Sequence, residues 1–261
     1  MGKRQLLLDI RPLIPELSGR YFEPFMGGAA VFFDQAPQRA FLRDINEELV
    51  NCYCQVRDYP DALLADLKRH IYDKDYYYQV RNRDRDKDAY AQLSDIERAS
   101  RLIFLNRTGF NGMYRVNRKG QFNIPFGRYA NPTIANETLI REASAALQNA
   151  DIRCQPYHTI LSEAEAGDFI YFDPPYLPVS KTANFTAYAA DDFTLSDQEA
   201  LAALCRELDQ KQVKFLLSNT YHEVITSLYD GFDFIKIEAR RAINSKADKR
   251  QPVPEILIKN Y

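Results

Sequence analysis

The stretch Asp168-Phe169-Ile170-Tyr171-Phe172-Asp173-Pro174-Pro175-Tyr176 decides the fold of this chain. An apolar run that stops at an acid and two prolines is typical of a buried parallel strand that ends in a rigid turn. In open α/β sheets, ligands bind at the carboxyl ends of such strands. The turn therefore predicts a site with a carboxylate, proline carbonyls and an aromatic ring, which together suit an amino group on a planar ring. Read alone, Asp173 to Tyr176 also fits an ordinary loop, because proline pairs are frequent in turns.

A second motif predicts a short strand, a glycine turn and a helix that opens on small residues. It reads Tyr21-Phe22-Glu23-Pro24-Phe25-Met26-Gly27-Gly28-Ala29-Ala30. Paired glycines let the backbone approach a bound ligand closely. The chain contains neither Gly-x-Gly-x-x-Gly nor a Gly-x-x-x-x-Gly-Lys-Ser/Thr phosphate loop, so neither NAD nor ATP is the expected ligand.

The stretch from Arg39 to Asp44 predicts a second strand that also ends in an acid. An acid about 20 residues after a glycine turn is placed to bind both hydroxyls of a ribose. Asp44 could equally cap a helix that begins near Asn46, and the two roles are compatible.

The predicted strands are interrupted by a long insert. They lie near residues 20–25, 39–44, 151–154, 168–173, 213–218, 232–237 and 254–260. Residues 57–145 break the alternation of strands and helices and are predicted to form an inserted domain. Residues 1–56 and 146–261 are then expected to form one α/β domain.

Local signals place several further elements. Capping patterns predict one helix after Ser94, with Glu97 three residues later, and another from Ser196, with Glu199 three residues later. Within the insert, the residues from Gly112 to Asn123 predict a β-hairpin around Arg118-Lys119-Gly120.

The composition indicates a folded chain with neither a membrane segment nor a metal site. At 261 residues and 46% hydrophobic, one large domain with an insert is expected. No run approaches the roughly 20 apolar residues of a membrane span, and no signal-peptide pattern follows Met1. The four cysteines form no Cys-x-x-Cys pair and the three histidines are scattered, so we expect no metal site. The cysteines are expected to be thiols in a reducing, cytoplasmic compartment.

Positive charge is concentrated in the insert. Residues 98–136 contain seven Lys or Arg residues and no acid, so this segment carries +7 in a chain whose net charge is −2, and the remainder carries −9. A basic segment in an otherwise acidic chain indicates a surface that binds a polyanion. Arginines that pair with acids elsewhere are the alternative, but interleaved aromatic residues favour nucleic-acid binding.

In this order the motifs resemble the Dam-type (D12 class, alpha group) site-specific DNA adenine-N6 methyltransferases. The resemblance extends through residues 106–115, which read NRTGFNGMYR, residues 120–129, which read GQFNIPFGRY, Leu217-Ser218-Asn219 and the closing residues 255–261. It implies a Rossmann-like class I methyltransferase sheet with an inserted, mainly helical target-recognition domain that carries a β-hairpin. It further implies methyl transfer from S-adenosylmethionine to N6 of a flipped-out adenine in duplex DNA, with GATC as the expected target.

The resemblance also assigns residues and context. The catalytic set is Asp173, Pro174, Pro175 and Tyr176, and the cofactor set is Lys3, Phe25, Gly27, Asp44 and Asp173. The DNA-binding set is Phe110, Asn111, Met113, Arg115, Asn123, Pro125, Arg128 and Tyr129, among which Arg115 is expected to read a guanine edge. The expected protein is a monomer of bacterial or phage origin that acts on chromosomal DNA, either in restriction–modification or as an orphan methylase.

Other functions remain open at this point. Relatives begin with a longer segment than Met1-Gly2-Lys3-Arg4, so a catalytically impaired or non-catalytic DNA-binding form is one alternative. Methyltransferases that act on glutamine amides or RNA adenine use a similar turn, although the basic insert argues against both.

Overall fold

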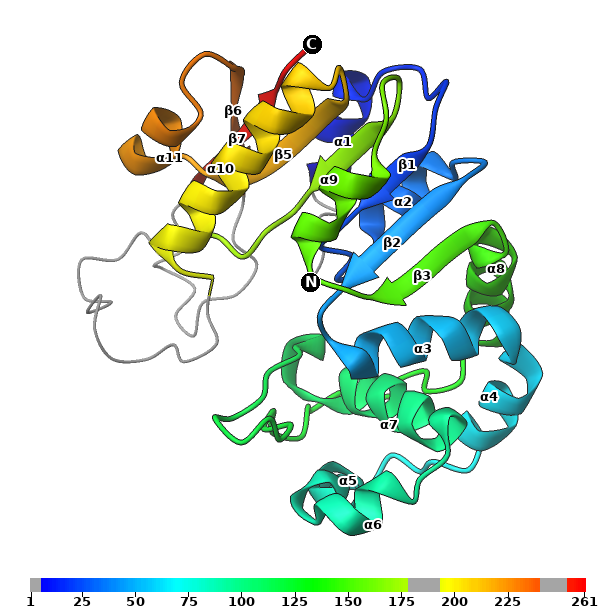
Figure 1. The fold of residues 1–261 in the computed structure, drawn as a ribbon. Helices are drawn as coiled ribbons and strands as arrows, with labels where there is room; N and C mark the ends of the chain where they lie inside the picture. Colours follow the sequence, from blue (N-terminus) through cyan, green and yellow to red (C-terminus); the bar gives the residue numbers. More distant parts are fainter. Residues whose placement is uncertain (1–5, 178–192, 240–252) are drawn as a thin grey trace. The chain divides into compact units, whose positions relative to one another are not determined.

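The structure is a computed structural model that describes residues 6–177, 193–239 and 253–261. The chain forms two compact units. We call Ile45–Cys154 the helical unit, and Gly2–Asp44 together with Gln155–Tyr261 the sheet unit. The segment 57–145 that the sequence predicts as an insert lies inside the helical unit (Figure 1).

The sheet unit alternates strands and helices. Its elements are α1 (Leu7–Ile10), η2 (Arg11–Leu13), β1 (Tyr21–Glu23), α2 (Ala30–Gln35), β2 (Ala40–Asp44), η5 (Tyr157–Thr159), α9 (Ile160–Glu163), β4 (Phe169–Phe172), α10 (Leu195–Gln210), β5 (Lys214–Thr220), α11 (Glu223–Leu228), β6 (Asp233–Ala239) and β7 (Val253–Lys259).

The strands of this unit lie in the order β2-β1-β4-β5-β7-β6. β1 pairs in parallel with β2 and with β4, and β4 pairs in parallel with β5. β7 is antiparallel to both of its neighbours. The predicted α/β class and Rossmann-like sheet are thus confirmed, and the run before Asp173 is the buried parallel strand that its apolar sequence predicts.

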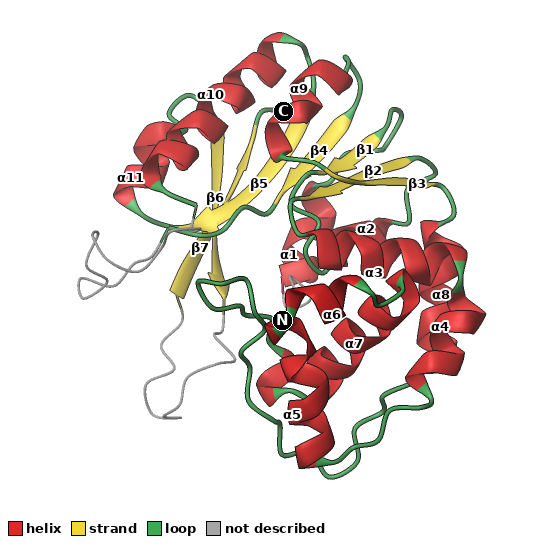
Figure 2. Ribbon diagram, turned by 60° about the horizontal axis from the view of Figure 1, so that its bottom comes forward, coloured by secondary structure: helices red, strands yellow, loops and turns green. Residues whose placement is uncertain are grey.

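Alternate side chains of the sheet build the core. Phe22, Ile170, Phe172 and Phe215 share one buried cluster with apolar residues of α9, α10 and α11. Figures 1 and 2 show α9 and α10 on one face of the sheet and α2 on the other. Burying each such side chain contributes about 1.5–3 kcal/mol, so the core fixes the register that brings the strand ends together.

The helical unit is built mostly of helices. Its elements are α3 (Glu47–Asp58), α4 (Pro60–Leu67), α5 (Lys74–Asn82), η3 (Arg83–Arg85), α6 (Lys87–Ala91), α7 (Asp95–Thr108), η4 (Phe110–Gly112), α8 (Glu137–Leu147) and β3 (Ala150–Cys154). Of these helices, α7, α3 and α8 are the longest. Tyr77, Phe104, Phe122 and Ile124 form its buried cluster, in which the hairpin residue Phe122 packs against α5 and α7.

Helix caps agree with the sequence at one place and differ at another. The predicted capping box of α7 is present, with Ser94 and Glu97 bonded reciprocally. The prediction that the second helix begins at Ser196 is wrong, because Thr194 and Asp197 form the capping box and α10 begins at Leu195. Both pairs satisfy the same Ser/Thr-x-x-acid pattern, and the structure uses the earlier pair.

Candidate active site and candidate DNA interface

Acids follow the parallel strands at the carboxyl edge of the sheet unit. Glu23 ends β1, Asp44 ends β2, and Asp173 directly follows β4. β1 and β4 are neighbours, yet β2 lies beyond β1 and β5 lies beyond β4. The chain therefore leaves the two central strands toward opposite sides, and such a switch point is where open α/β sheets bind ligands. Asp44 and Asp173 of the predicted site share this edge.

The carboxylate of Asp173 is held by buried hydroxyls. Ser218 on β5 donates a hydrogen bond to Asp173 Oδ1 at 3.0 Å, and Tyr171 OH lies 3.3 Å from Ser218 Oγ. Burial, with the nearby charge of Asp173, raises the pKa of Tyr171 well above its usual value. Tyr171 therefore stays protonated and donates to Ser218, whose own proton is then available for Asp173.

The two proline carbonyls of the turn differ in their surroundings. Gln198 Nε2 donates to the Pro175 carbonyl at 2.9 Å, and Asn219 Nδ2 donates to Gln198 Oε1 at 3.0 Å. Gln198 and Asn219 are fully buried, so leaving either amide unpaired would cost about 1–3 kcal/mol. For the Pro174 carbonyl, no protein hydrogen bond is found within residues 6–177, 193–239 and 253–261. α10 and β5 thus fix the turn through Pro175.

Two further hydrogen bonds fasten the end of the turn. Tyr176 OH donates to Glu255 Oε2 on β7 at 2.6 Å, and Thr220 Oγ1 donates to the Leu177 carbonyl at 3.2 Å. The Tyr176 ring is half-buried. The hydroxyl end of Tyr176 is therefore held by β7, directly after the proline pair of the turn.

The glycine turn is tied to the end of β2. Gly27 N donates to Asp44 Oδ2 at 3.0 Å, and Met26 N donates to the Arg43 carbonyl at 2.9 Å. Gly27 has a φ of 44°, and Ala29 at the start of α2 has a φ of 46°. For alanine this left-handed conformation costs about 1–2 kcal/mol, and such strain concentrates at ligand sites.

The two remaining residues of the predicted cofactor set are Phe25 and Lys3. The half-buried Phe25 stacks on Tyr157 with ring centroids 5.1 Å apart, and Phe193 meets it edge-on at 5.6 Å. Phe25 thus forms part of an aromatic wall rather than a single exposed platform. Lys3 lies outside the described residues.

Glu23 is a site residue to which the sequence reasoning assigned no role. Its side chain is buried at 2% exposure, and it accepts hydrogen bonds from Tyr21 OH at 2.7 Å and Phe32 N at 3.2 Å. Burial, reinforced by the charge of Asp173, raises the pKa of Glu23 to about 8. A buried acid at a strand end leaves no sequence signal beyond its position before Pro24.

In the helical unit, part of the predicted DNA-binding set lies where α7 ends. Phe110 N donates to the Pro125 carbonyl at 2.9 Å. Phe110 is 47% exposed, a large apolar side chain in water, and Asn111 adopts a left-handed φ of 56°. Met113 packs partly against the buried cluster of this unit.

The predicted hairpin is present, although without regular strands. Val116 and Phe122 form an isolated antiparallel bridge, and Asn117 N donates to the Gln121 carbonyl at 2.8 Å. At its base, Asn123 N donates to the Arg115 carbonyl at 3.0 Å and Arg115 Nε donates to Asn123 Oδ1 at 2.7 Å. The structure thereby brings Arg115 and Asn123 together.

Arg128 and Tyr129 follow the hairpin and are exposed. Tyr129 OH donates to the Gly109 carbonyl at 2.9 Å. The chain passes so close here that a Cβ at Gly127 would lie 2.4 Å from the Tyr129 ring and 2.8 Å from the Thr108 carbonyl. Glycine is required at position 127 for this close approach, which joins the segment after the hairpin to the end of α7.

The basic segment is partly neutralised inside the helical unit. Arg98 pairs with Glu48 at 2.5 Å and Arg101 pairs with Asp84 at 2.8 Å. For these two residues the alternative interpretation, pairing with acids elsewhere in the chain, is correct. Lys119 and Arg128 form no ion pair with the part of the chain that the structure describes, so the positive surface is carried by the hairpin and the segment that follows it.

The described residues contain neither a metal-binding cluster nor a helix that could span a membrane. No group of three or more His, Cys, Asp or Glu side chains in these ranges is arranged to hold a metal ion. Among the described helices, none has the length and apolarity needed to cross a bilayer.

Comparison with known proteins places the chain in one family. The family model for D12 class N6 adenine-specific DNA methyltransferases matches residues 2–243. The chain is 44% identical over 264 residues to the type II methyltransferase M1.LlaDCHI of Lactococcus lactis subsp. cremoris, with 100% of this chain and 93% of that protein covered. It is 40% identical to the type II methyltransferase M.MjaIII of Methanocaldococcus jannaschii, with 100% and 96% covered. It is 34% identical to the DNA adenine methylase of Escherichia coli K12, with 98% and 91% covered.

Proposed function

The chain belongs to the D12 class N6 adenine-specific DNA methyltransferases, and from that premise we propose that it methylates a flipped-out adenine within GATC, using the residues described above. Family membership establishes the reaction class, S-adenosylmethionine-dependent methylation of adenine N6 in DNA. The target sequence, the base flipping and the residue roles are our proposal. The observation that carries it is the Asp173 carboxylate held at the switch point of the sheet.

The residues at the carboxyl edge fit S-adenosylmethionine. When bound, this cofactor supplies an electrophilic methyl group on a sulfonium. Asp44 is a carboxylate at a strand end beside a turn whose Gly27 amide it already orients, which suits the ribose hydroxyls. Phe25 would line the adenine side, and the carboxylate of Asp173 would stand near the cationic centre. Lys3 completes the proposed cofactor set.

Asp173 and Pro174 would prepare the amino group for attack. The N6 lone pair of adenine is delocalised into the ring, so the free amine is a poor nucleophile. Asp173 Oδ and the Pro174 carbonyl accept its two hydrogens, which draws N6 toward a tetrahedral shape and directs the lone pair out of the ring plane. Because Pro175 is bonded to Gln198, Pro174 is the carbonyl we assign to N6.

The same two acceptors would stabilise the transition state. Positive charge grows on N6 as its bond to carbon forms, and a preorganised carboxylate and carbonyl stabilise that charge where it develops. Asp173 need not be a strong base, because the methylated ammonium is acidic enough to release its proton afterwards. Holding N6 in line with the methyl group supplies much of the remaining rate enhancement.

Adenine N6 is buried in duplex DNA, so the nucleotide must leave the stack. We assign Tyr176 to stack on the extruded base, since it is the aromatic residue of the turn that carries Asp173 and its hydroxyl is held by Glu255. Phe110, exposed at the end of α7, would fill the space that the base vacates. Asn111 and Met113 adjoin it. Arg115 would read guanine through O6 and N7, and Asn123, Pro125, Arg128 and Tyr129 would contact neighbouring bases or phosphates.

The decisive experiment measures methyl incorporation from labelled S-adenosylmethionine into a duplex that contains GATC and into each of its single-base-pair variants. Digestion to nucleosides and mass spectrometry then identify the product. We expect N6-methyladenine, formed on GATC and at least tenfold more slowly, or about 1.4 kcal/mol less favourably, on each variant. Label that appears on RNA or on a glutamine amide, but not on duplex DNA, would overturn the proposal. A different preferred duplex would overturn GATC alone.

A further inference from the structure

Phe122 in the helical unit has backbone groups that the hairpin itself does not satisfy. The ladder bonds of the hairpin involve Asn123 N with the Arg115 carbonyl and Asn117 N with the Gln121 carbonyl. Successive residues of an antiparallel strand direct their N–H and C=O groups to opposite edges. The N–H and C=O of Phe122 therefore point away from the hairpin. Phe122 is only 2% exposed, so these groups need partners within the protein.

Asp84 and Arg85 of η3 supply those partners. Phe122 N donates to Asp84 Oδ2 at 2.7 Å, and Arg85 Nη2 donates to the Phe122 carbonyl at 2.6 Å. The two side chains also pair with each other. Together they bind the outer edge of the hairpin as a neighbouring strand would, with side chains in place of a backbone.

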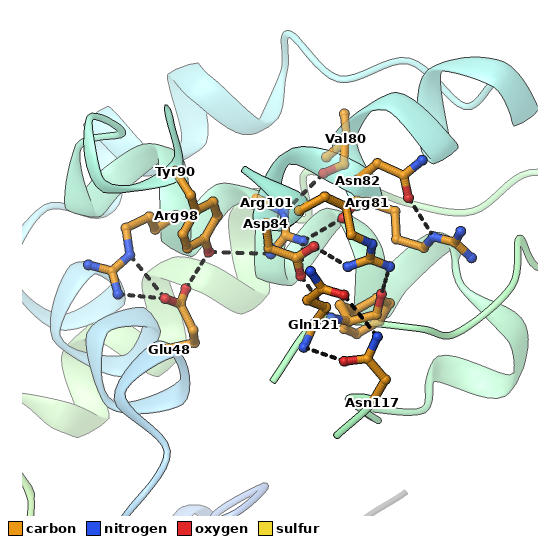
Figure 3. Close-up of polar contacts among 12 residues, drawn as sticks. Glu48, Val80, Arg81, Asn82, Asp84, Tyr90, Arg98, Arg101, Asn117 and Gln121 are labelled. Atoms are coloured by element: carbon orange, nitrogen blue, oxygen red, sulfur yellow. Dashed lines mark hydrogen bonds and ion pairs between the residues drawn. The ribbon is translucent and has the colours of Figure 1, made fainter. Parts of the chain in front are cut away.

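Arg101 of α7 holds Asp84 in place. Arg101 Nη2 lies 2.8 Å from Asp84 Oδ2, and both side chains are largely buried. Arg101 also donates to the Val80 carbonyl at 3.0 Å and the Arg81 carbonyl at 2.7 Å, in the last turn of α5 (Figure 3). A guanidinium fixed by several acceptors is rigid, so the Asp84 carboxylate has one favourable position.

A second acid extends this network to α3. Tyr90 OH accepts from Arg101 Nη1 at 3.3 Å and donates to Glu48 Oε2 at 2.8 Å, and Arg98 pairs with Glu48 at 2.5 Å. Figure 3 shows these side chains converging from the surrounding helices. The anchor of the hairpin is thus tied to α3, α5 and α7.

The anchored residue adjoins the pair that would meet DNA. Asn123 directly follows Phe122, and its Oδ1 accepts from Arg115 Nε. Within the described residues the two terminal nitrogens of Arg115 make no hydrogen bond, and a fork of such nitrogens suits guanine O6 and N7. A displacement of Phe122 would carry Asn123 with it and change the direction of the Arg115 guanidinium.

We propose that Asp84 is a positioning residue for sequence reading, which acts through Phe122 and Asn123 to aim Arg115 at its base. The inference rests on the proposed role of Arg115 in guanine recognition. It assigns a specificity role to an ion-paired cluster that acts through the backbone of the hairpin. Arg85 shares the role through the Phe122 carbonyl.

The test compares Asp84→Ala, Arg85→Met and Arg115→Ala with the parent. Asp88→Ala is the matched control, because it removes the same charge from exposed α6, where no contact to the hairpin is found among the described residues. Methyl transfer is measured on the GATC duplex and on its guanine-substituted variant, with kcat and KM separated. We expect Asp84→Ala and Arg85→Met to reduce the preference for GATC about tenfold, with kcat on GATC changed less than about threefold.

A double substitution supplies a readout that a merely structural role would not move. If Asp84 acts through Arg115, Asp84→Ala should cause no further loss of discrimination in an Arg115→Ala background, because coupled residues are not additive. Equal losses on both duplexes, or additive losses in the double variant, would overturn the inference.

The remaining outcomes separate the inference from the proposed function. If Arg115→Ala lowers discrimination while neither Asp84→Ala nor Arg85→Met does, the positioning role fails and the role of Arg115 stands. If Arg115→Ala leaves discrimination intact, the assignment of Arg115 fails and the inference fails with it. Should Asp84→Ala unfold in a thermal scan, Arg85→Met decides, because the Arg85 side chain is 30% exposed and its loss leaves the Arg101–Asp84 pair in place.

Discussion

Neutral hydroxyl and amide groups donate to Asp173, Pro175 and Leu177 in the turn of the sheet unit, whereas charged side chains hold Phe122 in the hairpin of the helical unit. Ser218, Gln198 and Thr220 donate to the turn through hydroxyl or amide groups. Asp84, Arg85 and Arg101 fix the hairpin through ion pairs and charge-assisted hydrogen bonds. Both units therefore position one functional group through a backbone turn, but with different chemistry.

The difference is consistent with the roles that we propose for the two units. A carboxylate that must stabilise a growing positive charge keeps most of its field when its supports are neutral. A hairpin that approaches a polyanion gains from a rigid cationic framework, and buried pairs resist the salt that screens exposed ones. Catalytic and recognition roles should then respond differently to mutation and to pH.

The largest expected effect is the loss of the Asp173 carboxylate. Asp173→Ala should reduce turnover on the order of 10²-fold or more, because it removes an acceptor placed where charge develops. Affinity for duplex should change little, since the residues that we propose to read the sequence and to bind phosphate lie in the helical unit. Single-turnover methyl transfer and a fluorescence binding titration measure the two quantities.

Asp173→Asn is the matched variant, because it keeps an acceptor oxygen and removes the charge. If the turnover of Asp173→Asn lies between that of the parent and that of Asp173→Ala, both the hydrogen bond and the charge of Asp173 contribute to the rate. Parent-like turnover in Asp173→Ala would remove the basis of the catalytic assignment.

The next effect concerns specificity. Arg115→Ala should lower discrimination at guanine by about 1–3 kcal/mol and leave turnover on GATC nearly unchanged. Lys119→Ala is the control from the tip of the same hairpin: if it contacts phosphate, it should weaken binding to all duplexes equally. The ratio of kcat/KM between GATC and a guanine-substituted duplex is the measurement. Equal losses on both duplexes would make Arg115 a phosphate contact.

The sequence predicts the strand and the acid of the Asp173 turn, but not the side chains that hold the turn in place. An apolar run that ends at Asp173 predicts a buried strand and its ligand edge, because burial and chain direction are local properties. Gln198 carries no such signal, since it reaches Pro175 across 23 positions through a single hydrogen bond. The pattern that places a helix at Ser196 occurs also at Thr194, and the pattern alone does not decide between them.

Prediction from the sequence is limited in the same way for the basic segment, residues 98–136. The basic segment predicts a polyanion-binding surface, yet nothing local distinguishes Arg101, which is buried against Asp84, from Arg128, which is exposed. The distinction depends on which face of α7 is covered. Counting charges along the sequence therefore predicts where a polyanion would bind but overstates the charge of that surface.

A smaller effect is expected for the Ser218 hydroxyl, which donates to Asp173. Ser218→Ala should reduce turnover about fivefold, because a net hydrogen bond contributes about 1 kcal/mol, while KM for duplex should not change. Ser227→Ala, exposed on α11, is the control. A change in KM without a change in kcat would show that Ser218 supports the fold and not the orientation of Asp173.

The smallest effect lies in stability, where the two units should respond to pH in opposite directions. Burial lowers the pKa of His70 in the helical unit to about 4 from 6.5, so the unfolded chain binds a proton more readily between these values and stability falls as pH drops below 6.5. Burial raises the pKa of Glu23 in the sheet unit to about 8 from 4.5, so the folded chain holds the proton and stability falls as pH rises from 4.5 toward 8.

Thermal unfolding across this pH range, with His70→Gln and Glu23→Gln, separates the two contributions. His70→Gln should flatten the acid limb by about 1 kcal/mol near pH 5.5, a value reduced for the partial exposure of the ring. Glu23→Gln should flatten the alkaline limb and leave the acid limb unchanged. If both variants altered the same limb, the two buried groups would not titrate independently. The sheet unit and the helical unit would then not differ in how their stability depends on pH.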